Sequence, residues 1–210
     1  LISTGGSGGH VIPAAILYEH LKNESNVFMS CDDRGAQYLD KDKFKIKIIN
    51  VPKISKNIFL LPFQIFLLLI LTLKSIFFLK KKKITIMIST GGYMSLPLCI
   101  ASKILNVKLF LFEPNIVLGR SNNLFIRSCK KIFCYSNNIK NFPEKFKNKI
   151  SVIPTLLRKE FYSTKIANDL NKEITLLVIG GSQGAQIFNT IIQDAILELS
   201  KSYTLNIFHQ

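Results

Sequence analysis

Short apolar runs alternate with longer helix-like segments along most of the chain. The runs are rich in β-branched and aromatic residues, as in strands buried on both faces of a sheet. They lie at 26–31, 45–51, 84–89, 108–112, 131–135, 150–153 and 174–179. Segments of helical length lie between several of them, at 10–22, 57–79 and 94–105. This alternation predicts an α/β fold with a doubly wound parallel sheet.

Glycine-rich turns follow three of the apolar runs: Gly-Gly-Ser-Gly-Gly-His at 5–10, Thr-Gly-Gly-Tyr at 90–93 and Gly-Gly-Ser-Gln-Gly-Ala at 180–185. In open α/β sheets, ligands bind at the carboxyl ends of strands, where glycine lets backbone amides and a helix N-terminus approach a phosphate. We therefore expect a phosphate-rich ligand, and for any single turn tight turning alone remains an even alternative. The candidate diphosphate-binding residues of the second and third turns are Gly91, Gly92, Gly181, Gln183 and Gly184.

His10 directly follows the first glycine turn. Pro13, three residues later, suits the first turn of a helix, because an N–H group is dispensable there. The helix dipole then disfavours the imidazolium form and keeps a neutral ring that can accept a proton. We therefore interpret His10 as a candidate general base. A histidine that merely caps or packs beside the turn is the equal alternative.

Two nucleotide-binding motifs fit the glycine turns poorly. A G-x-G-x-x-G dinucleotide fingerprint aligned on Gly6 and Gly8 meets Val11 where glycine or alanine is required. Asp32 or Asp33 does lie where a ribose-binding acid is expected, so a nicotinamide-dependent oxidoreductase is weakened but remains an alternative. None of the three turns ends in the Gly-Lys-Ser/Thr of a Walker loop, which argues against nucleoside triphosphate hydrolysis.

The most apolar stretch, 58–79, is followed directly by four lysines. Interruptions near both ends leave a clean apolar run of only 65–73, which is short for a membrane span. We expect a helix that lies against an anionic membrane surface, with a buried core helix as the next alternative and a true span as the third. The expected membrane contacts are Phe63, Phe66, Leu67, Ile70, Lys80 and Lys81.

The net charge limits the classes of binding partner that we expect, and the cysteine content bears on metal binding. Twenty-eight Lys and Arg against thirteen Asp and Glu give a net charge of +15, which favours phosphate, an acidic membrane or nucleic acid as partner. Nucleic acid is not expected, because no recognisable nucleic-acid module accompanies the charge and the lysines crowd the apolar helix. The four cysteines form no Cys-x-x-Cys pair, and we expect neither a metal nor a cofactor.

The chain has the pattern of one domain and part of another. Residues 155–173 carry little strand pattern, and a fresh strand, turn and helix begin after them. The 174–210 stretch is too short to bury its own sheet faces as an independent domain. We expect a first domain at 1–154, a linker at 155–173 and the beginning of an incomplete second domain at 174–210.

Four motifs together resemble the MurG family of undecaprenyl-diphospho-muramoylpentapeptide β-N-acetylglucosaminyltransferases. They are GGSGGHVIPA at 5–14, GGY at 91–93, EPN at 113–115 and GGSQGA at 180–185, and they occur in the family's order. The resemblance implies a GT-B fold, in which a Rossmann-like domain is followed by the start of a second one. It implies transfer of GlcNAc from UDP-GlcNAc to the MurNAc C4 hydroxyl of lipid I, with inversion, to give lipid II. The protein would act as a peripheral enzyme on the cytoplasmic face of the inner membrane.

The resemblance also assigns roles to individual residues. It implies His10 as the base, Asn115 as a substrate contact, and Arg158 and Ser182 as contacts of the UDP part. Ser7, Gly8 and Gly9 would face the diphosphate or the donor. From the residues alone, Arg158 also reads as a surface residue, Ser182 as a helix cap and Asn115 as a turn residue.

Two positions depart from the family's pattern. Pro114 stands where the family usually has glutamine, and 154–158 reads PTLLR where the family has Gly-Asn-Pro-Val-Arg. The segments that hold most of the donor in the family lie beyond the matched motifs. A non-catalytic fragment that binds lipid diphosphate or membrane is therefore the second hypothesis.

Overall fold

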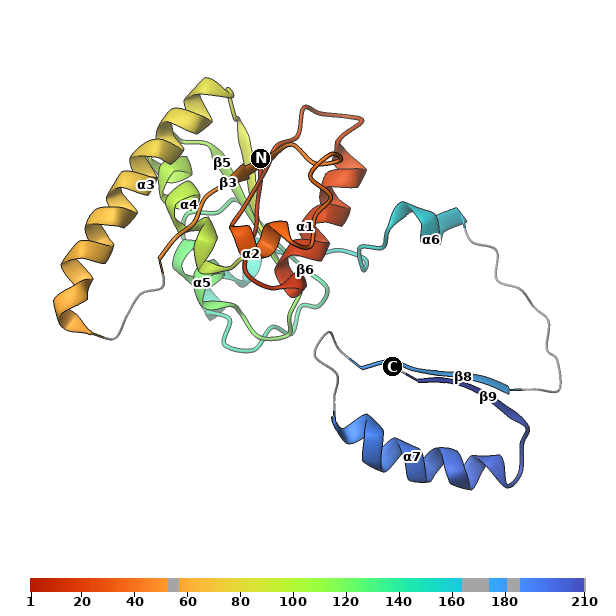
Figure 1. The fold of residues 1–210 in the computed structure, drawn as a ribbon. Helices are drawn as coiled ribbons and strands as arrows, with labels where there is room; N and C mark the ends of the chain where they lie inside the picture. Colours follow the sequence, from red (N-terminus) through yellow and green to blue (C-terminus); the bar gives the residue numbers. More distant parts are fainter. Residues whose placement is uncertain (53–56, 164–173, 181–185, 210) are drawn as a thin grey trace. The chain divides into compact units, whose positions relative to one another are not determined.

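The computed structural model describes residues 1–52, 57–163, 174–180 and 186–209 (Figure 1). The chain forms two compact units, Leu1–Ser163 and Thr164–Gln210.

The first unit is built on a parallel sheet. Its strands within the described residues are β1 (Ile2–Ser3), β2 (Met29–Cys31), β3 (Ile46–Ile48), β4 (Ile86–Ser89), β5 (Lys108–Glu113), β6 (Ile132–Cys134) and β7 (Ile150–Val152). They pair in the order β3-β2-β1-β4-β5-β6-β7, and every pair is parallel. The predicted doubly wound α/β fold is therefore confirmed, and the predicted apolar runs form the strands.

Helices cover the sheet and connect its strands. They are α1 (Gly8–Leu21), α2 (Asp33–Ala36), α3 (Leu61–Lys81), α4 (Leu96–Ile104), α5 (Arg120–Phe125) and α6 (Lys159–Ser163). Short 3₁₀ turns at Ile58–Leu60, Tyr93–Ser95 and Glu144–Lys149 complete the connections. Apolar side chains of the sheet form two buried clusters with the helices. One cluster includes residues of α1, and the other includes residues of α4 and the start of strand β4. Parallel strands covered on both faces bury consecutive residues, which explains the continuous apolar runs of the sequence.

Helix α3 packs mainly against α4 and lies at one side of the unit (Figure 1). Its buried residues are Thr72, Ser75 and Leu79, and the two hydroxyls donate hydrogen bonds of 2.8 Å to the carbonyls of Leu68 and Leu71 in the same helix. Six of its fourteen Leu, Ile and Phe side chains are exposed instead and only Leu79 is buried, so the buried core helix weighed from the sequence is not what the structure has.

By length and composition, α3 is apolar enough to cross a membrane, with a mean hydropathy of 2.1 in its most apolar window. Only 11% of that window is buried. The helix runs to Lys81, so the interruptions that shorten the clean apolar run in the sequence do not break it.

The second unit contains one strand–helix–strand repeat. Strand β8 (Ile174–Val178) pairs in parallel with β9 (Leu205–His209), and α7 (Gln186–Ser200) lies between them in sequence.

Helix α6 lies inside the stretch expected as a linker, 155–173, and the first unit extends to Ser163. Two contacts tie this stretch to α1: His20 Nε2 lies 3.0 Å from the Leu157 carbonyl, and the His20 ring meets the Tyr162 ring edge-on. The assignment of the two units as acceptor and donor domains stays a prediction.

Candidate functional site

The first two glycine turns meet at the centre of the sheet. Strands β1 and β4 are neighbours, and the strand order runs away from them in opposite directions on the two sides. Such a topological switch point splays the loops at the carboxyl ends of the two strands and leaves room for a ligand. The turn after β1 carries His10, and the turn after β4 carries Gly91 and Gly92.

Asp32, a buried residue at the start of α2, holds the turn after β1 in place through hydrogen bonds. Its carboxylate accepts hydrogen bonds from the amides of Gly6 (2.8 Å) and Gly35 (3.0 Å) and from Arg34 Nε (3.0 Å). Burial raises the pKa of Asp32, but these hydrogen bonds outweigh it and hold the pKa below its ordinary value of 3.8. Because the carboxylate is committed to the turn, Asp32 is not placed to bind a ribose.

His10 has a fixed tautomer. Its Nδ1 lies 2.8 Å from the Thr90 carbonyl oxygen, which can only accept a hydrogen bond. Nδ1 therefore carries the proton in the neutral ring, and Nε2 is left with a lone pair. Thr90 Oγ1 also lies 3.1 Å from the His10 carbonyl and 2.8 Å from Thr4 Oγ1. One buried threonine thus holds both the ring and the backbone of His10.

Glycine is required where the second turn passes the His10 ring. Gly91 and Gly92 have φ values of +91° and +78°, a region that side chains rarely adopt. A Cβ atom on Gly91 would also stand 3.3 Å from His10 Cε1. The two glycines therefore let the turn lie against the imidazole, and their contact with a diphosphate stays a prediction.

A cavity of about 560 Å³ opens beside His10. Its described lining residues are His10, Gly91, Gly92, Tyr93, Leu96, Glu113, Gly119, Arg120, Ser121, Asn122 and Leu124. They come from the end of β5 and from the turns and helices that follow β1, β4 and β5, so the cavity lies over the carboxyl ends of three adjacent strands.

Glu113 shapes the side of this cavity formed by the turn after β5. Its Oε1 accepts a 2.9 Å hydrogen bond from Asn115 Nδ2, and its Oε2 accepts from Gly119 N (2.7 Å) and Asn122 Nδ2 (3.0 Å). The side-chain amide of Asn115 is thus bonded within its own turn, and Asn115 is not among the cavity's described lining residues. Its expected contact with substrate stays a prediction.

No role for Glu113, Thr90 or Asn122 was predicted from the sequence. Glu113 and Asn122 are each 1% exposed, and Thr90 is fully buried. A polar residue at the end of an apolar strand was the available signal for Glu113 and Thr90, since buried polar groups are kept only with hydrogen-bond partners.

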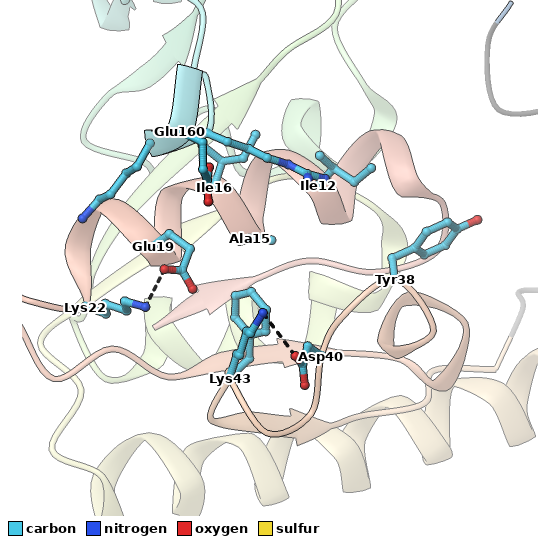
Figure 2. A pocket seen from close by; sticks show the side chains of 12 residues that line it. Ile12, Ala15, Ile16, Glu19, Lys22, Tyr38, Asp40, Lys43 and Glu160 are labelled. Carbon is cyan, nitrogen blue, oxygen red and sulfur yellow. Dashed lines mark ion pairs between the residues drawn. The ribbon is translucent and has the colours of Figure 1, made fainter. Parts of the chain in front are cut away.

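Arg158 lines a second hollow, of about 490 Å³. Figure 2 shows this hollow beside α1. Ile12, Ala15, Ile16 and Glu19 of α1 line it, together with Tyr38 and Phe44 from the segment between β2 and β3. Figure 2 shows two ion pairs at its border, Glu19–Lys22 at 2.5 Å and Asp40–Lys43 at 3.5 Å. The structure therefore does not bring Arg158 and His10 into one cavity of the first unit.

The remaining expected site residues divide into two groups. Ser7 is the N-cap of α1 and makes no side-chain capping bond, and Gly8 and Gly9 form the first turn, next to His10. A Cβ atom on Gly8 would stand 3.3 Å from Tyr38 Cε1, so this turn lies beside the hollow of Arg158 as well. The expected residues Gly181, Ser182, Gln183 and Gly184 lie outside the described residues.

Known proteins resemble this chain over its whole length. It is 58% identical over 210 residues to the UDP-N-acetylglucosamine--N-acetylmuramyl-(pentapeptide) pyrophosphoryl-undecaprenol N-acetylglucosamine transferase of Pelagibacter ubique, covering 100% of this chain and 59% of the relative. The protein of the same name from Prochlorococcus marinus strain MIT 9301 is 31% identical over 206 residues, covering 96% of this chain and 56% of the relative. The chain thus spans somewhat more than half the length of these curated relatives.

The fold is shared with a solved structure. The crystal structure of MurG from Acinetobacter baumannii superposes with a TM-score of 0.71 at 24% identity, covering 100% of this chain and 57% of that one. The expected GT-B type of α/β fold is therefore confirmed for the first unit. Residues 1–134 match the N-terminal domain of glycosyltransferase family 28, and because this match takes in well over half of the chain, the chain belongs to that family.

Proposed function

We propose that this chain forms the acceptor-binding part and the beginning of the donor-binding part of an inverting N-acetylglucosaminyltransferase. The reaction moves GlcNAc from UDP-GlcNAc to the MurNAc C4 hydroxyl of lipid I and gives lipid II for peptidoglycan synthesis. The names of the similar proteins support this substrate pair and give no support to a nicotinamide-dependent oxidoreductase. One structural observation carries the proposal: the lone pair of His10 Nε2 at the cavity over the sheet's switch point.

The arrangement of His10 suits a general base. Nε2 takes the proton of the acceptor hydroxyl while the hydroxyl oxygen attacks the anomeric carbon, and the bond from that carbon to the UDP oxygen breaks. The attack comes from the face opposite UDP, so the anomeric configuration inverts. The imidazolium that forms keeps its Nδ1–H bonded to the Thr90 carbonyl, which stabilises the positive charge.

The departing diphosphate needs positive charge and amide donors. The first amides of α1, at Gly8 and Gly9, have no partner within the helix, and the helix dipole adds positive potential there. Arg158 supplies a guanidinium in the neighbouring hollow. Ser182, which lies outside the described residues, is assigned from its motif alone. We assign Ser7, Gly8, Gly9, Arg158 and Ser182 to the donor on this basis.

Helix α3 supports a peripheral position on the cytoplasmic face of an anionic membrane. Phe63 and Phe66 are 61% and 59% exposed, and Leu67 and Ile70 are half-buried beside them. Lys80 and Lys81 are exposed at the carboxyl end of the helix, where cations are favoured and anionic head groups can be reached. This face brings the enzyme to the surface that holds its lipid-linked acceptor.

The test is a GlcNAc-transfer assay on lipid I with the complete reading frame of the gene and its His10→Ala variant. Loss of a general base is expected to lower kcat by about 10²- to 10⁴-fold and to remove the pH dependence that the base imposes. His20→Gln is the matched control, because glutamine can keep the hydrogen bond to the Leu157 carbonyl. Equal turnover by the His10 variant and the wild type would remove His10 from this role.

A further inference from the structure

We infer that Arg120 binds the diphosphate of the lipid-linked acceptor, and that an apolar crevice under α3 receives the first part of its lipid chain. The inference rests on the proposed function and names where the two chemically different ends of that substrate lie. It is carried by the charges of the cavity beside His10, by the crevice, and by one leucine that lines both.

Arg120 is the lining residue of the cavity whose positive charge is not paired with a carboxylate of the described residues. It is exposed at the start of α5 and forms no ion pair within the described part of the chain. Glu113 is the one carboxylate among the described lining residues, and both of its oxygens already accept N–H donors. These hydrogen bonds leave the negative charge of Glu113 in place but occupy its oxygens. Arg120 is the cationic side chain among the described lining residues, and the fork of donors on its guanidinium matches phosphate oxygens.

The crevice, of about 170 Å³, lies at the amino-terminal half of α3. Its described lining is apolar apart from Gln64, and it comprises Val51, Pro52, Leu61, Gln64, Ile65, Leu68 and Leu96. Such a site gains binding energy from hydrocarbon and has little to offer a sugar or a phosphate.

Leu96 joins the two sites. It lines both the cavity of His10 and the apolar crevice, so the two share a wall at the first residue of α4. Beyond the crevice, α3 exposes Phe63 and Phe66. The cavity with Arg120, Leu96, the crevice and the exposed helix face thus follow one another in the order diphosphate, first lipid units and membrane, which is the order of groups along a lipid diphosphate.

The diphosphate half is tested by calorimetric titration of the 210-residue chain, without vesicles, with farnesyl diphosphate, farnesyl monophosphate and inorganic pyrophosphate below their aggregation limits. We expect farnesyl diphosphate to bind tighter than the monophosphate by about tenfold, as one added charged hydrogen-bond pair predicts. Arg120→Gln is expected to abolish that preference. Arg127→Gln, which removes the same charge from an exposed residue outside the cavity, is expected to keep it.

The lipid half is tested with two positions on one face of α3. Ile65 and Leu69 are 56% and 57% exposed and lie one helical turn apart, but only Ile65 is among the described lining residues of the crevice. Ile65→Gln is expected to weaken farnesyl diphosphate binding by about fivefold and to leave pyrophosphate binding unchanged. Leu69→Gln is expected to leave both unchanged.

Equal effects of the two arginine variants, or of the two α3 variants, would overturn the corresponding half of the inference. The transfer assay separates this result from the proposed function. If His10→Ala abolishes transfer while Arg120→Gln leaves the KM for lipid I unchanged, the glycosyltransferase stands and the role of Arg120 is lost. If Arg120 controls diphosphate binding but the complete enzyme transfers no GlcNAc, the proposed reaction is lost and the binding site stands.

Discussion

Helices α1 and α3 belong to the same unit but bury opposite kinds of side chain. Helix α1 buries Val11, Ala14 and Tyr18 against the sheet. Helix α3 buries Thr72 and Ser75 together with Leu79, and it turns large apolar side chains outward. The apolar side chains on the inner face of α1 are buried within the unit, whereas α3 leaves six of its fourteen Leu, Ile and Phe side chains exposed.

This difference shows that an apolar run in the sequence can have two different roles in the folded protein. In α1, the apolar residues position His10, because they fix the helix whose first turn carries the ring. In α3, Leu68, Leu71 and Leu79 pack against the core, whereas the exposed apolar side chains of the outer face contribute little to the fold. Stability should therefore respond to changes on the buried face of α1, and membrane affinity to changes on the outer face of α3.

The largest expected effect comes from the outer face of α3. Phe63→Ser combined with Phe66→Ser is expected to weaken binding to anionic vesicles by about 2–4 kcal/mol, since two half-exposed aromatic rings lose their apolar contact. Vesicle sedimentation measures the change, and urea unfolding is expected to stay the same. Phe161→Ser, on a ring 64% exposed in α6, is the control. An equal loss in the control would end the contrast between the helices.

The inner face of α1 gives the next effect. Val11→Ala is expected to lower the free energy of unfolding by about 2 kcal/mol, because the side chain is fully buried and its removal leaves a cavity. Vesicle binding should not change. Ile12→Ala, at a neighbouring position 40% exposed, should cost clearly less in the same urea titration. Similar costs at both positions would show that α1 is not held by its buried face.

A smaller effect is expected at the end of α3. Lys81→Gln should weaken binding to anionic vesicles by about 1 kcal/mol at low salt and by less at high salt, because the attraction is screened. Neutral vesicles should not distinguish it from the wild type. Lys103→Gln, at an exposed position in the last turn of α4, is the charge-matched control. A loss independent of lipid charge would argue against a role of Lys81 at the head groups.

The smallest effect concerns the pH dependence of the turn that begins α1. The pKa of Asp32 is lowered in the folded state, so its ionised form stabilises the fold above the ordinary value of 3.8. That stabilisation is lost as the pH falls through the lowered pKa. Asp32→Asn should remove this part of the acid dependence in urea titrations at about pH 7 and at pH values below the ordinary pKa, whereas exposed Asp42→Asn should keep it. Identical acid dependence in all three proteins would contradict the anchoring role.

The sequence predicted the strands and main helices because their patterns are local. A buried parallel strand reads as a continuous apolar run, and α4 begins beside Pro97, a residue suited to the first helical turn. The glycine turn and Pro13 made His10 a candidate base, and the resemblance to known motifs assigned it that role. The burial of α3 could not be read from its pattern, because an apolar helix has the same composition whether it faces a core or a membrane.

The parts of the site that escaped prediction are held by distant contacts. Thr90 is 80 residues from His10, and neither its carbonyl nor its hydroxyl is marked by any spacing rule. Asn115 was expected to face substrate because of its motif, but motif membership does not reveal that Glu113 takes its side-chain amide. Arg158 was grouped with His10 by the same reasoning, although the two residues line different cavities within the first unit.

The hydrogen bond between His10 and Thr90 joins the turns of two neighbouring strands, so the ring senses whether β1 and β4 are in register. A slip of either strand would move the carbonyl away from Nδ1, and the neutral imidazole could then carry its proton on either nitrogen. The nitrogen chemical shifts of the His10 ring thus report whether β1 and β4 are correctly paired at the middle of the sheet.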